Sequence, residues 1–264
     1  ILWQFTVCSC YATQFNCISF VNKQLMSDKI KVLVLGDSGV GKSSFVHLIC
    51  HSKPITNTSW TIGCSIDVKH HEYKQGTPQQ RTCFIQLWDV GGSRSHSIAR
   101  NIFYNSIHGI ILVYDLTNMK SYLNLRKWLG QVFYNKDSMS FKENMSASRL
   151  SAALFPVAPL DDFEFDLESF FEKNIPVLIV GTKFDQIQNT STKFMNLPFA
   201  DECGAEEIQI DCLQSKSLAA GSTNSVKLSR FFDKVIQRKY HGLTSYQDKP
   251  KRQSVNKSYI NKYN

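Results

Sequence analysis

Residues 30–43 read I-K-V-L-V-L-G-D-S-G-V-G-K-S, and this stretch decides the fold. It begins with a short, nearly continuous apolar run, which is typical of a strand buried on both faces. The glycine-rich segment that follows matches G-x-x-x-x-G-K-S/T, a pattern that is specific when it follows a strand and opens a helix. We therefore predict a strand at 30–35, a phosphate-binding loop at 36–43 and a helix from Ser43 to about Cys50.

The residue types in this loop suit a polyphosphate ligand. Glycines let the backbone approach phosphate oxygens closely, so that successive amides can point inward, and the helix N-terminus adds a positive potential. We expect the Lys42 ammonium to bridge the β- and γ-phosphates and the Ser43 hydroxyl to bind Mg²⁺. The predicted nucleotide contacts in the loop are Gly36, Asp37, Ser38, Gly39, Val40, Gly41, Lys42, Ser43 and Ser44.

A second motif, G-T-K-F-D at 181–185, follows another buried strand and selects the base. The Asp185 carboxylate can accept two hydrogen bonds from the N1–H and the exocyclic amine of guanine, whereas adenine offers an acceptor and no amine there. A mismatched base would leave a buried carboxylate unpaired, which is unfavourable. We therefore expect a guanine nucleotide, with the stem of Lys183 along the base and with Thr182 and Phe184 in the same site.

Strand-like and helix-like segments alternate along the rest of the chain. Asn224–Tyr240, for example, places most of its apolar residues, from Val226 to Ile236, on one helical face. This alternation predicts an α/β fold with a mostly parallel six-stranded sheet and helices on both faces. The further expected strands lie at 65–73, 81–90, 109–116, 176–180 and 208–211, with a turn at 76–78 and helices at 121–134 and 224–240.

Five motifs together resemble those of a Ras-superfamily small GTPase of the Rab type. They read G-D-S-G-V-G-K-S, W-T-I-G, L-W-D-V-G-G, H-G-I-I-L-V-Y-D-L-T and G-T-K-F-D, in family order across residues 29–240. The resemblance implies the P-loop small-GTPase fold with GTP or GDP and Mg²⁺ as ligands. Thr61 lies 18 positions after Ser43, so it takes the role of the switch I threonine. By the same resemblance, Ser43, Thr61 and Asp89 hold the metal and the Gly92 amide contacts the γ-phosphate.

Ser93 departs from this family pattern, because it stands where a glutamine normally orients the attacking water. Losing one such transition-state contact typically lowers the rate by about 10²–10³, and intrinsic hydrolysis in this class is already slow, at about 10⁻⁴–10⁻³ s⁻¹. We expect the catalytic contribution of Ser93 to be weak and intrinsic turnover to be near zero. Arg94 and His96 are the nearby residues that could substitute, but nothing in the sequence places them at a phosphate.

Asp211 and Cys212 form the second departure. They follow the strand at 208–210 where the family usually has S-A-K, so this contact to the base is degenerate. Their backbone amides could still reach the guanine oxygen. We therefore include both residues among the predicted nucleotide contacts.

A narrower resemblance, to an atypical branch of Rab-like proteins, is carried by two further stretches. Residues 59–68 read S-W-T-I-G-C-S-I-D-V, and residues 219–236 read A-A-G-S-T-N-S-V-K-L-S-R-F-F-D-K-V-I. This resemblance implies a cytoplasmic, non-prenylated homodimer that modulates the signalling or prenylation of other small GTPases. Its implied partners are effectors, regulators or prenylation chaperones. Two alternatives stay open, namely an active GTPase switch in membrane trafficking that needs an activating partner, and an interaction scaffold with a structural nucleotide.

The composition is that of an ordinary soluble domain, with 42% hydrophobic and 20% charged residues in a chain of 264. No apolar run is long enough for a transmembrane helix, and the eight cysteines show no zinc-site spacing. Because the last cysteine is Cys212, we expect no prenyl anchor. The net charge of +8 includes a basic C-terminal segment, from which we expect at most weak peripheral membrane contact and no nucleic-acid binding.

The sequence predicts three regions. Residues 1–26 are expected to be a non-native or disordered extension, 27–240 the GTPase domain, and 241–264 a basic disordered tail. Within the domain, an insertion at 136–172 begins with a stretch expected to be loop and ends in the acidic, aromatic segment 161–172. That last segment can form a helix, which either docks on its own domain or serves as a partner-binding helix or acidic lid.

Overall fold

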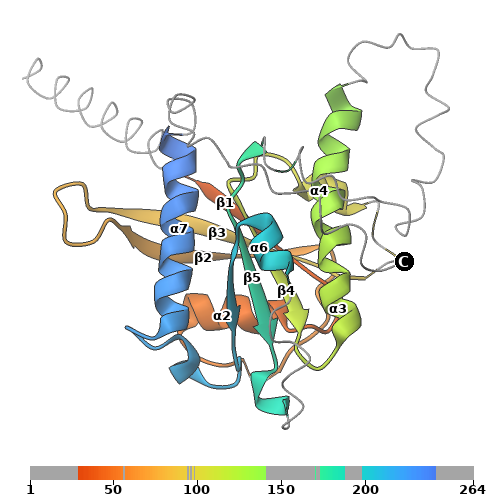
Figure 1. The fold of residues 1–264 in the computed structure, drawn as a ribbon, viewed down its shortest axis with the longest axis horizontal. Helices are drawn as coiled ribbons and strands as arrows, with labels where there is room; N and C mark the ends of the chain where they lie inside the picture. Colours follow the sequence, from red (N-terminus) through yellow and green to blue (C-terminus); the bar gives the residue numbers. More distant parts are fainter. Residues whose placement is uncertain are drawn as a thin grey trace, which may run out of the picture.

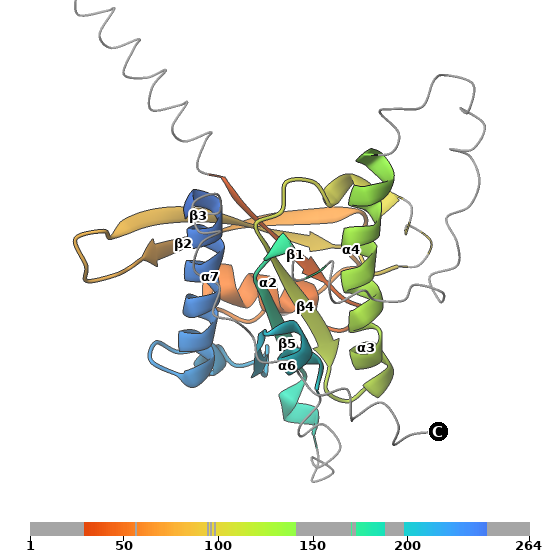
Figure 2. The same cartoon turned by 45° about the horizontal axis from the view of Figure 1, so that its top comes forward.

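The computed structural model describes residues 29–241, apart from 56, 94, 96, 98, 141–169, 171–172 and 188–197. Within these residues, six strands form one sheet in the order β2-β3-β1-β4-β5-β6, and helices cover both of its faces (Figure 1, Figure 2). The strands are β1 (Ile30–Leu35), β2 (Cys64–Tyr73), β3 (Arg81–Val90), β4 (Gly109–Asp115), β5 (Val177–Thr182) and β6 (Glu206–Gln209). The helices are α2 (Lys42–His51), α3 (Met119–Leu123), α4 (Leu125–Ser140), α6 (Phe199–Cys203) and α7 (Thr223–His241), with 3₁₀ turns η2 (Ala99–Phe103), η5 (Phe184–Gln186) and η7 (Ser215–Leu218).

The pairing of the strands confirms the predicted α/β class with a mostly parallel six-stranded sheet. β1 pairs in parallel with both β3 and β4, and β5 and β6 continue the sheet in the same direction. β2 is antiparallel to β3, and the hairpin that they form protrudes beyond the helices (Figure 1). In parallel strands the carboxyl ends share one edge of the sheet, so the loops after β1, β3 and β5 gather there.

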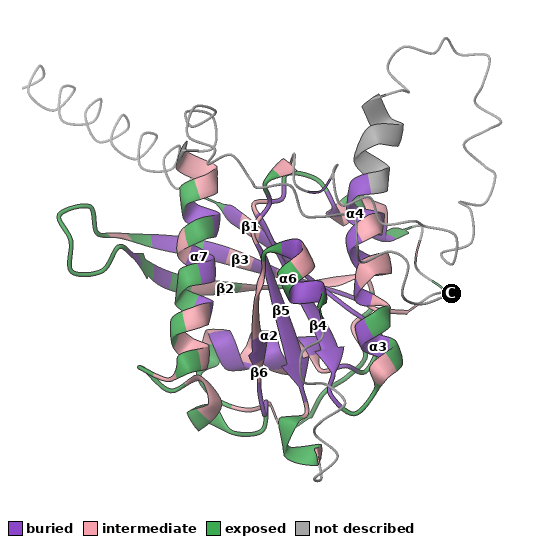
Figure 3. Ribbon diagram, in the orientation of Figure 1, coloured by how far each residue is buried: buried purple, intermediate pink, exposed green. Residues whose placement is uncertain are grey.

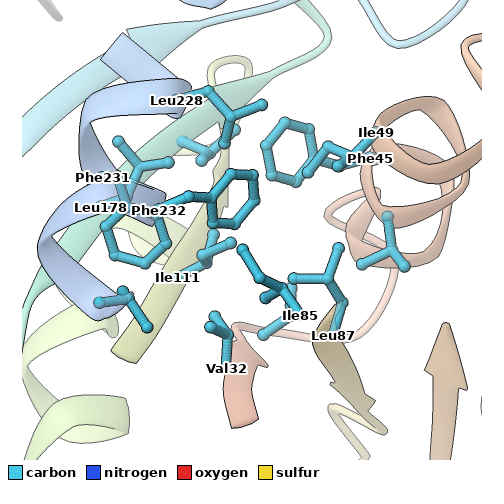
Figure 4. Close-up of a cluster of buried hydrophobic side chains, with 14 of the residues drawn as sticks. Val32, Phe45, Ile49, Ile85, Leu87, Ile111, Leu178, Leu228, Phe231 and Phe232 are labelled. Carbon is cyan, nitrogen blue, oxygen red and sulfur yellow. The ribbon is translucent and has the colours of Figure 1, made fainter. Parts of the chain in front are cut away.

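One face of the sheet packs against α2 and α7. Phe45 of α2 meets Leu228, Phe231 and Phe232 of α7 in a single apolar cluster (Figure 4). Each of these side chains is at most 7% exposed. Val226, which the sequence placed near the same stripe, is 46% exposed because it lies in the first turn of α7, before the buried stripe begins.

The opposite face packs against α3, α4 and α6. A second apolar cluster lies on this face. It contains the β4 side chains that face these helices, Phe199 of α6, and Trp128, Leu129 and Val132 of α4. Figure 3 shows the consequence, since β4 and β5 are buried throughout while the outer sides of the helices are largely exposed. Burial on both faces explains why the central strands read as continuous apolar runs.

The helix predicted at 121–134 is two helices, because α3 ends at Leu123 and α4 begins at Leu125, with Asn124 between them. The Asn124 side chain reaches the phosphate-binding loop, where its Nδ2 donates to Asp37 Oδ2 at 2.7 Å. At the start of α3, Asn118 caps the helix by accepting a hydrogen bond from the backbone of Lys120. The strand predicted at 208–211 starts earlier, at Glu206, and ends at Gln209, because β6 pairs with residues 178–181 of β5.

The prediction of a loop at the start of the insertion is wrong, because residues 136–140 continue α4. This stretch contains neither glycine nor proline, so nothing ends the helix there. Residues 141–169 lie outside the described residues. At the far end of the insertion Phe170 is 3% exposed, and its ring lies 5.6 Å from that of Phe133, so this residue docks on its own domain.

Across the part of the chain that the structure describes, no helix is both long and apolar enough to cross a bilayer. The predicted extension at 1–26 and nearly all of the predicted tail at 241–264 lie outside the described residues.

Candidate nucleotide-binding site

The phosphate-binding loop joins the end of β1 to the start of α2. Gly36 adopts φ +151°, and a Cβ at this position would lie 2.1 Å from the carbonyl oxygen of Val113 in β4. Only glycine fits so close to a neighbouring strand. The loop therefore leaves the sheet in contact with β4 and turns directly into the N-terminus of α2.

Lys42 is held inside this loop. Its Nζ donates to the backbone oxygens of Gly36 at 2.9 Å and Asp37 at 2.8 Å, and the side chain is 6% exposed. Burial lowers the pKa of Lys42 to about 8, although Asp89 and the Asp37 carboxylate favour the charged form. The ammonium therefore stays charged at neutral pH, and it lies where the glycine-rich backbone curves.

Three oxygen-bearing side chains meet beside the loop, as the family resemblance implied. Ser43 Oγ lies 3.0 Å from Thr61 Oγ1, and the Ser43 and Thr61 hydroxyls lie 2.5 Å and 3.2 Å from Asp89 Oδ2. The side chains come from α2, the loop before β2 and the end of β3. Asp89 is 1% exposed, and its Oδ1 is a buried oxygen without a hydrogen-bond partner among the described residues.

This cluster fits Mg²⁺, a hard cation that prefers oxygen ligands and usually binds proteins through one or two carboxylates. The unsatisfied Asp89 Oδ1 is the kind of buried group that a cation or its bound water would satisfy. In the described part of the chain, no group of three or more His, Cys, Asp or Glu side chains could hold a metal ion. A metal at this position would therefore depend on the Ser43 and Thr61 hydroxyls.

The turn after β3 lies between the Thr61 loop and the phosphate-binding loop. The Gly91 amide donates to Gly63 O at 2.8 Å, and a Cβ at Gly91 would lie 2.5 Å from Thr61 O. A Cβ at Gly92 would lie 2.5 Å from the backbone nitrogen of Ser38. Both glycines are therefore required by close backbone approaches on two sides.

Ser93 follows these glycines, and its hydroxyl lies 2.7 Å from the Ser95 hydroxyl. Its described partner is thus in its own loop and not in the Ser43, Thr61 and Asp89 cluster. Arg94 and His96, the residues that could have substituted for the missing glutamine, lie outside the described residues.

The base motif adjoins the phosphate-binding loop through Thr182. Its hydroxyl donates to Val40 O at 2.5 Å and lies 3.0 Å from Tyr114 O, so it links the loop to β4 and β5. Lys183 adopts φ +58°, and its Nζ pairs with Asp115 Oδ2 at 2.6 Å. Burial opposes ionisation of Asp115, but hydrogen bonds from Lys183 and Thr117 outweigh it and lower the pKa of this carboxyl.

Asp185 and Phe184 are exposed at the start of η5, next to the loop after β6. The Phe184 amide donates to Ile210 O at 3.3 Å, which joins the two loops. Asp211 is buried and accepts a hydrogen bond from the Leu213 amide at 2.8 Å. Burial, with the nearby charges of Asp211 and Asp185, raises the pKa of the Cys212 thiol to about 12.

Comparison with known proteins identifies the family. The sequence model of the Ras family matches residues 31–146. Rab-like protein 3 of Mus musculus is 48% identical over 225 residues, which cover 81% of this chain and 86% of the relative. The chain belongs to the Rab-like proteins of the Ras family. Rab-like protein 3 of Danio rerio is 47% identical over the same share of this chain, and small GTPase LIP1 of Arabidopsis thaliana is 40% identical over 114 residues, 39% of this chain and 33% of the relative.

Sequence reasoning missed one residue of this Rab-like protein that touches the candidate site. Arg100 in η2 is 2% exposed, and its Nη1 donates to Gly91 O and Ser93 O at 3.2 Å each. Its guanidinium lies 4.4 Å above the ring of Trp128. An arginine usually lies at the surface, so the sequence contains no signal for this buried position.

Proposed function

We propose that this Rab-like GTPase binds GTP and GDP with Mg²⁺ and regulates other proteins by direct contact, with weak or absent intrinsic hydrolysis. The observation that carries the proposal is the convergence of Ser43, Thr61 and Asp89 beside the buried Lys42. Members of the Ras family in general bind guanine nucleotides with Mg²⁺ and interact with regulators and effectors. The finer statements, about hydrolysis and partners, are inferences from the site.

In this proposal, the chain's own residues position the phosphates and the base. Lys42 reaches the β- and γ-phosphates from within the loop, and the Gly92 amide contacts the γ-phosphate. Ser43, Thr61 and Asp89 hold Mg²⁺, which when bound neutralises charge on the phosphate oxygens. Asp185 accepts the two guanine donors, and the stem of Lys183, which the Asp115 ion pair fixes, lies along the base. Asp211 and Cys212 contribute backbone amides to the guanine oxygen.

Weak hydrolysis follows from the chemistry at Ser93. A serine side chain is too short to orient a water as glutamine does, and this hydroxyl already has Ser95 as a partner. Loss of one preorganised contact to the transition state lowers the rate by about 10²–10³. Such a protein would stay in its GTP-bound form unless a partner supplied the missing group.

Direct contact with proteins is supported by the residues that flank Thr61. Trp60 is 87% exposed and Ile62 is 83% exposed, although both are large and apolar. Exposed aromatic residues of this kind are typical anchors of protein interfaces. Because they flank a residue of the proposed metal site, effectors or regulators that bind them could sense the nucleotide. We propose such partners, with prenylation chaperones of other small GTPases among them, and a homodimer in the cytoplasm.

Single-turnover hydrolysis tests the first part of this proposal. Purified protein is loaded with GTP in Mg²⁺, and phosphate release is compared between the unchanged chain and Ser93→Gln. We expect near-zero release from the unchanged chain and an increase of about 10²–10³-fold in the variant. A rate for the unchanged chain that matches an ordinary Rab protein would show that the argument from Ser93 is wrong, and would favour the active switch.

The scaffold alternative makes a different prediction about partners. If the nucleotide is merely structural, any protein captured by the chain should bind equally well in the presence of GDP and of a non-hydrolysable GTP analogue. The regulatory proposal predicts a preference for one of these states. A Trp60→Ala variant should lose that partner while keeping its nucleotide, because the Trp60 side chain is 87% exposed.

A further inference from the structure

Arg100 is the largest fully buried side chain in the described part of the chain, and its hydrogen bonds are directed at the turn after β3. Both acceptors, Gly91 O and Ser93 O, lie on either side of Gly92. No carboxylate among the described residues forms an ion pair with this guanidinium. A buried charge is costly unless polar groups satisfy it. These two carbonyls accept hydrogen bonds from Nη1, and the nearby Asp37 also favours the charged guanidinium, whereas Nε has no hydrogen-bond partner among the described residues.

The hydrogen bond from Arg100 to Gly91 O also affects Gly92, because Gly91 and Gly92 share one peptide group. The carbonyl of Gly91 and the N–H of Gly92 belong to one planar, trans peptide, so they point in opposite directions. An arginine that holds Gly91 O therefore sets the direction of the Gly92 N–H, which points away from Arg100. Gly92 itself lies against the phosphate-binding loop, since a Cβ there would be 2.7 Å from Gly36 O, the same oxygen that accepts from Lys42.

The arginine is itself held from the side of the phosphate-binding loop. Trp128 of α4 lies under the guanidinium, and its Nε1 donates to Asp37 Oδ1 at 2.8 Å. Asn124 donates to the other oxygen of the same carboxylate at 2.7 Å. Asp37 is the second residue of the loop. A continuous set of contacts therefore runs from the loop through α4 and Arg100 to the two carbonyls beside Gly92.

We propose that Arg100 is a positioning residue that orients the Gly92 amide toward the terminal phosphate of a bound nucleoside triphosphate, and that Trp128 couples this orientation to Asp37. The ligand class is a triphosphate in contrast to a diphosphate, because only the former places an oxygen at this amide. The inference rests on the proposed nucleotide binding. It predicts that loss of Arg100 weakens triphosphate binding more than diphosphate binding.

The test compares dissociation constants for GTPγS and GDP, in Mg²⁺, across variants of the full chain. We expect Arg100→Ala to weaken GTPγS binding about tenfold more than GDP binding, which is the size of one lost hydrogen bond to a charged group. Arg100→Lys can still donate to a carbonyl and should give a smaller change. Trp128→Phe keeps a ring under the guanidinium but loses the donor to Asp37, so we expect about a threefold change.

Arg238 provides a matched control. It also donates to two backbone oxygens, those of Ile107 and Lys173, at 3.0 Å each. Ile107 precedes β4, so this contact lies at the edge of the sheet opposite to the phosphate-binding loop. Arg238→Ala should lower thermal stability as Arg100→Ala does, but leave the ratio of the two dissociation constants unchanged.

The possible results separate this inference from the function on which it rests. A selective loss of GTPγS binding in the Arg100 and Trp128 variants, with the control unchanged, supports it. An unchanged ratio in folded Arg100→Lys and Trp128→Phe overturns it, even if Arg100→Ala does not fold. Binding of neither nucleotide by the unchanged chain would overturn the proposed function and this inference together.

Discussion

Asp89 combines burial, negative charge and an unsatisfied oxygen in one side chain. One carboxylate oxygen faces the Ser43 and Thr61 hydroxyls, and the other has no partner among the described residues. A carboxylate buried to 1% exposure without a cationic partner in hydrogen-bond contact is normally unfavourable. We propose that a cation that binds with the nucleotide satisfies this oxygen.

Replacing Asp89 tests this explanation. Asp89→Asn keeps the size of the side chain but removes the charge, and we expect the Mg²⁺ concentration that slows GDP release to rise about 10–100-fold. The measurement is the rate of nucleotide release across a Mg²⁺ titration. Asp67→Asn, a loss of charge on β2 away from the cluster, should leave the titration unchanged. An equal response of the two variants would contradict the assignment of the metal site.

The lowered pKa of Lys42 leads us to expect that nucleotide binding depends on pH. Its pKa is lowered to about 8 by burial, and bound phosphates would raise it again because they stabilise the ammonium. The complex therefore holds this proton more tightly than the protein alone, so affinity should fall as pH rises through about 8, by at most about tenfold per pH unit. Isothermal titration from pH 7 to 9 measures the effect. Lys42→Arg keeps its charge over this range, and its affinity should show no such fall.

At the scale of elements, the loops that follow β1, β3 and β5 are packed against one another with glycines at the contacts. Gly92 is the clearest case, because any side chain there would enter the backbone of the phosphate-binding loop. Interdigitation of this kind lets a small change in one loop displace another. The positions at which β1, β3 and β5 end therefore affect the shape of the candidate site.

Gly92→Ala should consequently destabilise the protein. The added methyl would lie 2.5 Å from Ser38 N, and overpacking of this kind costs about 1–3 kcal/mol. Urea denaturation measures the free energy of unfolding. Gly130→Ala in α4 is the control, since no atom outside its own stretch of helix backbone lies within 4 Å of an added Cβ and alanine favours a helix by about 0.5–1 kcal/mol. Equal stability changes in both variants would refute the proposed close packing.

α7 depends on its aromatic pair for attachment to the sheet. Phe232 is 1% exposed and sits between α2 and the strands (Figure 4), whereas Val226 is 46% exposed on the same helix. Phe232→Ala should lower the free energy of unfolding by about 3–5 kcal/mol, and Val226→Ala by less than about 0.5 kcal/mol. Thermal and urea denaturation of the two variants give the comparison. A similar small loss in both would mean that α7 contributes little to the core.

At the scale of the whole molecule, the sequence predicted the sheet better than the helices. The bounds of β1 and β3 match the prediction, because continuous or alternating apolar residues end at glycines. The division between α3 and α4 at Asn124 was not predicted. The backbone of Asn124 keeps helical dihedral angles, its side chain reaches Asp37, and no local signal marks that contact. α4 also continues into residues expected to form a loop.

The candidate site shows the same limit. The sequence placed Lys42, Ser43 and Asp89 in motifs, and the structure brings the Ser43 and Asp89 side chains together next to Lys42. Arg100 was not predictable, because its role arises only when the turn after β3 and α4 come together in space. Sequence motifs indicate the residues that contact a ligand more clearly than they indicate contacts between side chains far apart in the chain.

The central claim is that this Rab-like protein binds guanine nucleotides through these loops. Purified full chain is incubated with equal amounts of GTP and ATP in Mg²⁺, and the nucleotide that remains bound is released by denaturation and identified by chromatography. We predict GTP or GDP in close to stoichiometric amount, because Asp185 can pair with guanine and not with adenine. Recovery of ATP or ADP, or of no nucleotide at saturating concentrations, would contradict it.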